Sequence, residues 1–319
     1  MRQVSVVMSV YKETIQEVKT ALRSIQNQTY PEFEFIIVLD NPEYESMWRF
    51  LKDQAALDDR IRLIRNHKNI GLAMSLNKAA DAAQFPYIVR MDADDISSHD
   101  RIETELSYMI EHGCDLVFSD YLLTDQNGTV TGIFNEHYDD IEKSLIISNI
   151  IHHPTVLFTK DIFYKAGRYR NFPCSQDYDL WLRMMECRAH FGQIGKVLLK
   201  YRIRDDSVSN AHALKQTATL CYMKKLYFER MRYGTDSYSL AHYHRYMKQF
   251  GPEIYDKAKS LRFKSDLFYA QKMISRGHIF LGNLCKVFIL IQSKCYRTYY
   301  IQKMKSQLYV FIVRKSGRK

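Results

Sequence analysis

The sequence contains few of the residues that build flexible linkers, disulfide frameworks or exported segments. Its 319 residues include only 12 Gly and 6 Pro, which leaves little room for long unstructured linkers. The six Cys are scattered and form no C-x-x-C pair, so neither a zinc site nor a disulfide framework is indicated. No basic start is followed by an apolar signal segment, so we expect a protein of the reducing cytoplasm.

Two common phosphate-binding motifs are also missing. The chain has no G-x-G-x-x-G and no G-x-x-x-x-G-K-[ST]. A classical dinucleotide site and a P-loop are therefore excluded. A bound nucleotide would have to be held by a carboxylate, an aromatic side chain and a metal ion.

The composition that is present is that of a folded protein with a basic tail. Hydrophobic residues make up 46% and charged residues 26%, and the length allows one large domain with an appendage. Residues 256–319 hold 15 Lys and Arg against two acids, a balance of +13, whereas the rest of the chain carries −3. Such a tail could bind nucleic acid or an anionic membrane surface.

Short apolar runs alternate with helical patterns over the first hundred residues. Thr14 with Glu17 three residues later forms a capping box at the first helix. This alternation predicts βαβ units and a parallel sheet, whose ligands bind beyond the carboxyl ends of the strands. The predicted strands are 4–11, 33–39, 61–64 and 87–91, and the predicted helices are 14–28, 47–57 and 72–83.

The fourth predicted strand ends in three carboxylates within four residues, in the segment 88–95. Because successive side chains of a strand point to opposite faces, Asp92 and Asp94 would point the same way. Two carboxylates so placed repel each other, and a divalent cation with oxygen ligands would relieve this repulsion. The alternative is a solvated acidic loop in which Asp95 or Ser98 caps the next helix. The spacing alone leaves both interpretations open.

Taken together, these motifs resemble family 2 glycosyltransferases of the GT-A fold. The nucleotide-sugar half is represented by residues 4–11, Asp40, 69–72, 92–95 and 100–101, and residues 175–183 resemble the acceptor-side motif. The match covers about residues 1–210. It implies an α/β fold with a Rossmann-like, mostly parallel sheet flanked by helices, and a helical C-terminal appendage. We therefore expect a catalytic domain at 1–213, with a donor half at about 1–100 and an acceptor half at about 101–213, and a helical region at 214–319.

The resemblance implies roles for residues at the strand ends. Tyr11 would stack on the base of the nucleotide and Asp40 would accept a hydrogen bond from a pyrimidine N–H, although Asp40 could instead be a turn residue before Pro42. Asn41 and Pro42 stand where the family usually has an acid and Gly, which leaves the expected uridine preference open. Asp94 would bind Mn²⁺ or Mg²⁺, and Asp92 would contact the ribose or the same metal ion. The nucleotide-binding residues implied are Ser9, Val10, Tyr11, Asp40, Asn69, Asp92 and Ala93.

On the acceptor side, the resemblance makes Asp177 the general base of an inverting transfer. Gln176 stands where the family often has Glu, and the alternative is that Asp177 and Asp179 are only acids favoured at a helix N-terminus. Trp181 could stack on an acceptor sugar or belong to the core. The remaining candidates are His153 at the acceptor pocket and Arg202 or Arg204 in a loop closing over the diphosphate.

After about residue 214 the sequence pattern predicts helices rich in aromatic residues. Apolar residues within 279–291 recur at helical spacing, and the run is too short and too interrupted to span a bilayer. It predicts either a basic amphipathic helix in a membrane interface or a helical appendage that packs on the catalytic domain.

The leading hypothesis is an inverting glycosyltransferase. It would move a sugar from a UDP-sugar to a glycan or lipid-linked acceptor during capsule, O-antigen or exopolysaccharide synthesis, at the inner face of the cell membrane. One alternative is a nucleotidyltransferase, but residues 9–13 lack the Gly-rich basic loop expected there. The other is a nucleic-acid-binding protein using the tail. No nucleic-acid motif is visible, so we expect no such partner.

Overall fold

The computed structural model describes residues 3–203 and 213–315 and divides the chain into two compact units. Unit 1 comprises residues 1–145 and 149–203, and unit 2 comprises residues 146–148 and 204–319. The boundary thus lies ten residues before the one we expected, and a short segment from the first half of the chain belongs to the second unit.

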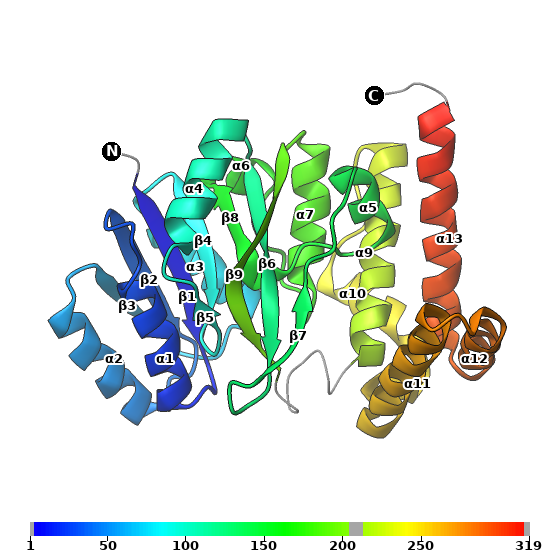
Figure 1. Cartoon of the computed structure of the whole chain (residues 1–319), viewed down its shortest axis with the longest axis horizontal. Helices are drawn as coiled ribbons and strands as arrows, with labels where there is room; N and C mark the ends of the chain where they lie inside the picture. Colours follow the sequence, from blue (N-terminus) through cyan, green and yellow to red (C-terminus); the bar gives the residue numbers. More distant parts are fainter. Residues whose placement is uncertain (1–2, 204–212, 316–319) are drawn as a thin grey trace. The chain divides into compact units, whose positions relative to one another are not determined.

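Unit 1 is an α/β layer structure built on one sheet of nine strands, in the order β3-β2-β1-β4-β8-β6-β9-β5 with β7 paired to β6. The first four strands are parallel neighbours (Figure 1), as the sequence predicts. The strands are β1 (Val4–Val10), β2 (Phe33–Leu39), β3 (Ile61–Arg65), β4 (Tyr87–Asp92), β5 (Ile96–Ser97), β6 (Leu116–Thr124), β7 (Val130–Phe134), β8 (Val156–Thr159) and β9 (Phe191–Arg202).

Helices flank this sheet, and those predicted before residue 91 are all present within a few residues of their expected ends. The capping box at the first helix is confirmed, because Thr14 and Glu17 exchange hydrogen bonds through their side chains and main-chain N–H groups. The helices of unit 1 are α1 (Ile15–Gln26), α2 (Glu45–Leu57), α3 (Leu72–Ala82), α4 (Arg101–His112), α6 (Lys160–Lys165), α7 (Gln176–Glu186) and the 3₁₀ turn η1 (His153–Thr155), while α5 (Ile141–Ile147) begins in unit 1 and ends in unit 2.

The register of the sheet brings three strand ends together. Ser9 on β1 lies opposite Val38 on β2 and opposite Asp92 on β4. The core strands are buried on both faces, which is why they read as nearly continuous apolar runs. The polar residues that follow β1, β2 and β4 therefore meet at one edge of the sheet, as expected.

Unit 2 is helical, and its last helices expose many apolar side chains. In it α11 packs along α12 at Gly282, where an added Cβ would lie 2.7 Å from the main-chain oxygen of Ala270. Helix α12 was expected to carry one apolar stripe, but it is apolar on almost every side. The helices are α9 (Ala213–Tyr233), α10 (Leu240–Lys248), η2 (Gly251–Tyr255), α11 (Lys257–Ser275), α12 (Ile279–Gln292) and α13 (Lys294–Lys315).

Among the described residues, no single helix has both the length and the apolar character to cross a membrane. Helices α12 and α13, counted through Ile312, meet that criterion only as a pair bent by 120°.

Candidate functional site

The ends of β1 and β2 form the first part of the site. Tyr11 follows β1 directly, and 44% of its surface is exposed. The side-chain amide of Asn41 donates to the main-chain oxygen of Tyr11 at 3.1 Å, which ties the two strand ends together. An exposed ring held at a strand end is suited to stacking on a planar ligand. The side chains of Val10 and Ala93 are buried, so only their main-chain groups are available to a ligand.

Asp40 is buried at the end of β2 and holds the loop before α3. Its carboxylate accepts hydrogen bonds from the Asn66 side chain at 2.8 Å and from the main-chain N–H groups of Ile70 and Gly71 at 2.9 and 2.8 Å. The exposed Asn69 also accepts from the Gly71 N–H, at 2.9 Å. The structure thus gives Asp40 a loop-fixing role, and its predicted contact with a pyrimidine remains a prediction.

Two arginines contact the acidic turn at the end of β4. Arg90 forms an ion pair with Asp92, and Arg202 donates through Nε to the main-chain oxygen of Asp94 at 3.0 Å. The main-chain N–H of Arg202 donates to Asp95 at 2.9 Å. Burial, followed by the charges of Asp92 and Asp94, raises the pKa of Asp95 well above its usual range.

The alternative interpretation, in which this turn caps the next helix, is contradicted by the structure. Helix α4 begins at Arg101, its N-cap residue Asp100 makes no side-chain capping bond, and Asp95 instead binds the end of β9. Arg202 was expected over a diphosphate, and two of its guanidinium nitrogens contact main-chain oxygens here. Arg204 lies outside the described residues.

The turn is suited to a divalent cation that is shared with a ligand. Within 3–203 and 213–315, no three His, Cys, Asp or Glu side chains are grouped so as to hold a metal by themselves. Mg²⁺ commonly uses one or two carboxylates and completes its shell with phosphates and water, and Asp92 with Asp94 would supply that number. The buried Oδ2 atom of Asp95 also has no hydrogen-bond partner in the described structure. The residues therefore fit Mn²⁺ or Mg²⁺, whose binding remains a prediction.

Asp177 lies buried at the first turn of α7. The side chain of Asn149 donates to its Oδ2 atom at 3.0 Å. Burial raises the pKa of Asp177, while the hydrogen bond from Asn149 and the charge of Arg90 act to lower it. Ser175, the N-cap residue, has a left-handed backbone with φ of 56°, and strain of this kind in a non-glycine residue is common at functional sites.

The other acid of this motif has a structural role. Asp179 is fully buried and pairs with Arg183, whose Nε lies 2.9 Å from its carboxylate. Arg183 also donates to the main-chain oxygens of Ala166 and Arg168. The pair therefore fixes the loop 166–170 against α7.

Of the two interpretations given for Trp181, stacking on an acceptor sugar is wrong and a position in the core is confirmed. Trp181 is fully buried and packs edge-on against His153 and Phe158, so it has no surface on which a sugar could stack. His153 is as buried as Asp177 and lies in the 3₁₀ turn η1, with its Nε2 2.8 Å from the Tyr169 hydroxyl, and its position at the acceptor pocket remains a prediction. His152 stacks on Tyr121, and burial lowers its pKa to about 3.

Arg90 and Asn149 are the site residues that sequence reasoning missed. Arg90 was read as part of an apolar strand, although a charge two residues before Asp92 on the same face was a usable signal. No local pattern marks Asn149, because its contact with Asp177 spans 28 positions.

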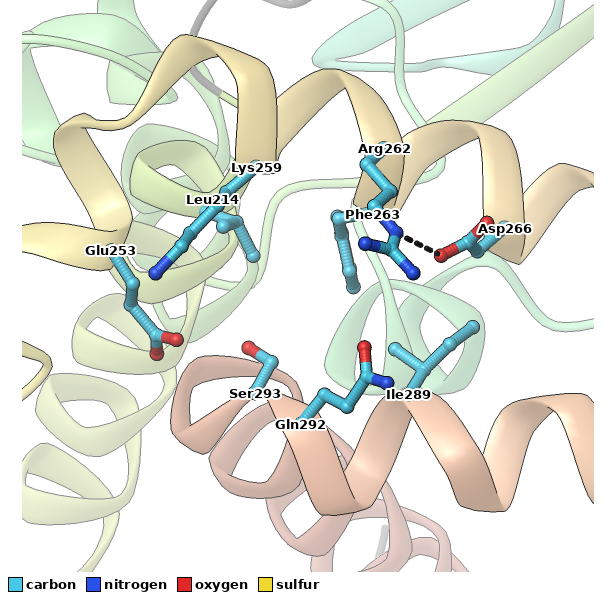
Figure 2. Close-up of a pocket in the computed structure, with 9 residues that line it drawn as sticks. All are labelled: Leu214, Glu253, Lys259, Arg262, Phe263, Asp266, Ile289, Gln292 and Ser293. Carbon is cyan, nitrogen blue, oxygen red and sulfur yellow. Dashed lines mark ion pairs between the residues drawn. The ribbon is translucent and has the colours of Figure 1, made fainter.

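One charged pocket in unit 2 is lined by none of the residues of this site. It lies between α11 and α12 (Figure 2), and its volume is about 150 Å³. Lys259 and Arg262 are balanced there by Glu253 and Asp266, and Arg262 lies 3.7 Å from Asp266. The pocket therefore has no net charge with which to attract an anion.

Comparison with known proteins identifies sequence relatives. The family model described as Glycosyl transferase family 2 matches residues 5–163. An uncharacterized glycosyltransferase of Methanocaldococcus jannaschii is 37% identical over 65% of this chain and 73% of its own length. The O-antigen biosynthesis glycosyltransferase WbnJ of Escherichia coli is 32% identical over 65% of this chain and 82% of its own. The amylovoran biosynthesis glycosyltransferase AmsE of Erwinia amylovora is 30% identical over 64% and 78%.

Solved structures support the fold. The structure of S. aureus TarS in complex with UDP-GlcNAc is similar with a TM-score of 0.58, covering 99% of this chain and 92% of that one. Its sequence is only 12% identical, so the likeness concerns the fold alone. The prediction of an α/β GT-A fold with a C-terminal helical region is confirmed.

Proposed function

Because this chain belongs to glycosyl transferase family 2, we propose that it transfers a sugar from a nucleoside-diphosphate sugar, expected to be a UDP-sugar, to a glycan or lipid-linked saccharide. The observation that carries this proposal is that unit 1 has an exposed ring and an acidic turn at one edge of its sheet, together with a buried carboxylate on which the charge of Arg90, the ion-pair partner of Asp92, acts. The relatives named for O-antigen and amylovoran synthesis support a role in surface polysaccharide assembly. The UDP-GlcNAc complex of a protein with the same fold supports the donor class.

The chemistry follows from the placement of the two acidic centres. Asp177 takes the proton of an acceptor hydroxyl while that oxygen bonds to the anomeric carbon, and the bond from that carbon to the diphosphate breaks on the opposite face. The configuration at the anomeric carbon is thereby inverted, and the nucleoside diphosphate leaves with the electron pair of the broken bond. A divalent cation on Asp92 and Asp94 would supply positive charge to the departing diphosphate. Burial strengthens Asp177 as a base because it raises the pKa of this carboxyl.

A screen of nucleotide sugars tests this proposal through release of the nucleoside diphosphate. Asp177→Asn should lower kcat by about 10²-fold or more and leave donor affinity close to that of the wild type. Asp161→Asn is the matched control, because Asp161 is also an acid in the first turn of a helix but is exposed on α6. If both variants lose activity equally, or if Asp177→Asn keeps a tenth of it, Asp177 is only a helix-terminal acid.

We also propose that α12 and its neighbours bring the enzyme to an anionic membrane surface, where a lipid-linked acceptor would lie. Residues 256–319 carry a balance of +13. Phe280 of α12 is 79% exposed, which is an unfavourable arrangement in water for so large an apolar side chain. The exposed apolar residues of α12 are Ile279, Phe280, Leu281, Leu284, Val287, Phe288 and Ile291. Together these features support insertion of α12 into the interface rather than binding by charge alone.

Cosedimentation with phosphatidylglycerol vesicles tests this placement. Phe280→Asp should weaken binding about tenfold or more, because it removes about 1.5 kcal/mol of apolar insertion and adds a like charge. Leu57→Asp on α2 is the control, since Leu57 is 80% exposed but lies in the other unit. Binding that vanishes completely with salt, or that falls equally in both variants, would contradict insertion of α12.

A further inference from the structure

Among its described residues, unit 1 contains three buried arginines, and in two of them the guanidinium is paired with a carboxylate and with main-chain oxygens. Arg101 pairs with Glu105 at 2.7 Å and also donates to two main-chain oxygens. Arg183 pairs with Asp179 and donates to main-chain oxygens of the loop beside it. This is the usual state of a structural arginine, because an unpaired buried donor costs free energy.

Arg90 differs from both. It is only 2% exposed and forms one ion pair, with Asp92. Its Nε and Nη1 atoms have no hydrogen-bond partner among the residues that the structure describes. A strand residue buried for packing alone would not retain such groups, so their presence points to a role in the site.

The surroundings of Arg90 show what that role is. It lies in β4 opposite Val7 of β1, two residues before Asp92 and hence on the same face of the strand. Its charge acts on groups from both halves of the site. The titratable groups that interact with it are Asp92 and Asp95 of the acidic turn, His152 and His153 before and within η1, Tyr169 of the loop before α7, and Asp177 of α7.

We propose that Arg90 is a positioning residue that serves both halves of the site, fixing Asp92 for the donor and acting as the buried counter-ion of Asp177. The inference rests on the proposed function, in which Asp177 is the base. It assigns to one buried guanidinium both the ion pair with Asp92 and the positive charge that acts on Asp177. A planar guanidinium with several fixed donors is suited to this, whereas a single ammonium is not.

Asn149 provides a matched comparison. Both Asn149 and Arg90 act to lower the pKa of Asp177, but of these two only Arg90 also pairs with Asp92. Removing either group should raise the pKa of Asp177. Because the base must be ionised to accept a proton, the acidic limb of the pH profile of kcat/KM should then move to higher pH. Only the loss of Arg90 should also weaken donor binding.

The test compares Arg90→Met, Arg90→Lys and Asn149→Ala, each checked for folding by circular dichroism. Two quantities are measured: the acidic limb of kcat/KM, and the affinity for UDP with Mn²⁺ by calorimetry. In Arg90→Met the acidic limb should move to higher pH by about one unit, and the affinity for UDP should fall about tenfold. In Asn149→Ala the limb should rise while UDP affinity stays at the wild-type value. Arg90→Lys keeps the charge, so its limb should stay near that of the wild type while UDP binding is weakened.

Wild-type UDP affinity in Arg90→Met, or an unmoved acidic limb, would overturn the proposal. If Arg90→Met does not fold, Arg90→Lys tests the proposal instead. UDP affinity equal to that of the wild type in Arg90→Lys would likewise overturn it. UDP binding requires no base, so the donor half of the inference is judged even if Asp177→Asn stays active and the proposed base fails.

Discussion

The carboxylate of Asp40 offers a sharp test of how this fold builds its nucleotide edge. It accepts three hydrogen bonds of 2.8–2.9 Å, two from main-chain N–H groups of the loop before α3 and one from Asn66. Asp40→Ala would remove the acceptor of all three and leave the donors in a buried place. We expect unit 1 to be destabilised and the loop 66–71 to lose its conformation.

The size of the effect follows from these contacts. A hydrogen bond to a charged group contributes about 1.5 kcal/mol at the low end, so three of them give about 4.5 kcal/mol. Part of this should be recovered, because Asn66 also donates to Ser75 at 3.0 Å and Asn69 also accepts from Gly71. We therefore expect a loss of about 3 kcal/mol. For a unit of this size that corresponds to a fall in Tm of about 6–12 °C.

Differential scanning calorimetry measures this fall. Asp125→Ala is the control, because Asp125 also accepts two main-chain N–H bonds, from Asn127 and Thr129 at 2.9 Å, but in an exposed turn. The control should lose less than about 1 kcal/mol, since water can replace the carboxylate there. If Tm falls by the same amount in both variants, the argument that burial makes the Asp40 hydrogen bonds important is refuted. The affinity of Asp40→Asn for UDP then tests the predicted contact with the base separately.

The remaining predictions concern the metal, the packing of β9 and the buried histidines. Asp94→Ala should abolish the part of the UDP affinity that depends on Mn²⁺, as measured by calorimetry. If the wild type binds UDP equally well with and without a chelator, the metal assignment is contradicted. Gly192→Ala should lower the free energy of unfolding by about 1–3 kcal/mol in a denaturant titration, because the added Cβ would lie 2.7 Å from side-chain atoms of Cys114 and Tyr108. Gly195→Ala on the same strand is the control. Its Cβ would meet only the His137 side chain, at 3.3 Å, so this change should be tolerated. The folded-state pKa of His152 lies at about 3, below the unfolded value of 6.5, so its contribution to stability is complete above pH 6.5 and is lost as the pH falls toward 3. At pH 5 this contribution should be smaller by about 2 kcal/mol, and His152→Phe, which keeps the ring stacking, should remove that part of the pH dependence of unfolding. The part that comes from His153, whose pKa is also lowered by burial, should remain.

Local patterns in the sequence were sufficient for the donor half of the fold. Strands β1, β2 and β4 are buried on both faces, so they appear as short apolar runs. The helix between β1 and β2 shows apolar residues at helical spacing and a capping box. The order of motifs predicted the GT-A fold, and the pairing of Asp92 with Asp94 drew attention to the strand end. The helix at 279–291 was also predicted, because its apolar residues recur at helical spacing.

Tertiary structure alone decided which polar residues act together. Asp40 meets a loop some 30 positions away, Asn149 reaches Asp177 across 28, and the main chain of Arg202 binds Asp95 across 107. Such contacts leave no periodicity, so no local pattern can indicate them. Trp181 shows the same limit, because a large aromatic residue is equally plausible at a sugar site and in a core, and only its complete burial distinguishes the two. The sequence thus determined the elements and the edge of the sheet where the site lies, whereas the pairing of charges within that site depended on how distant segments pack.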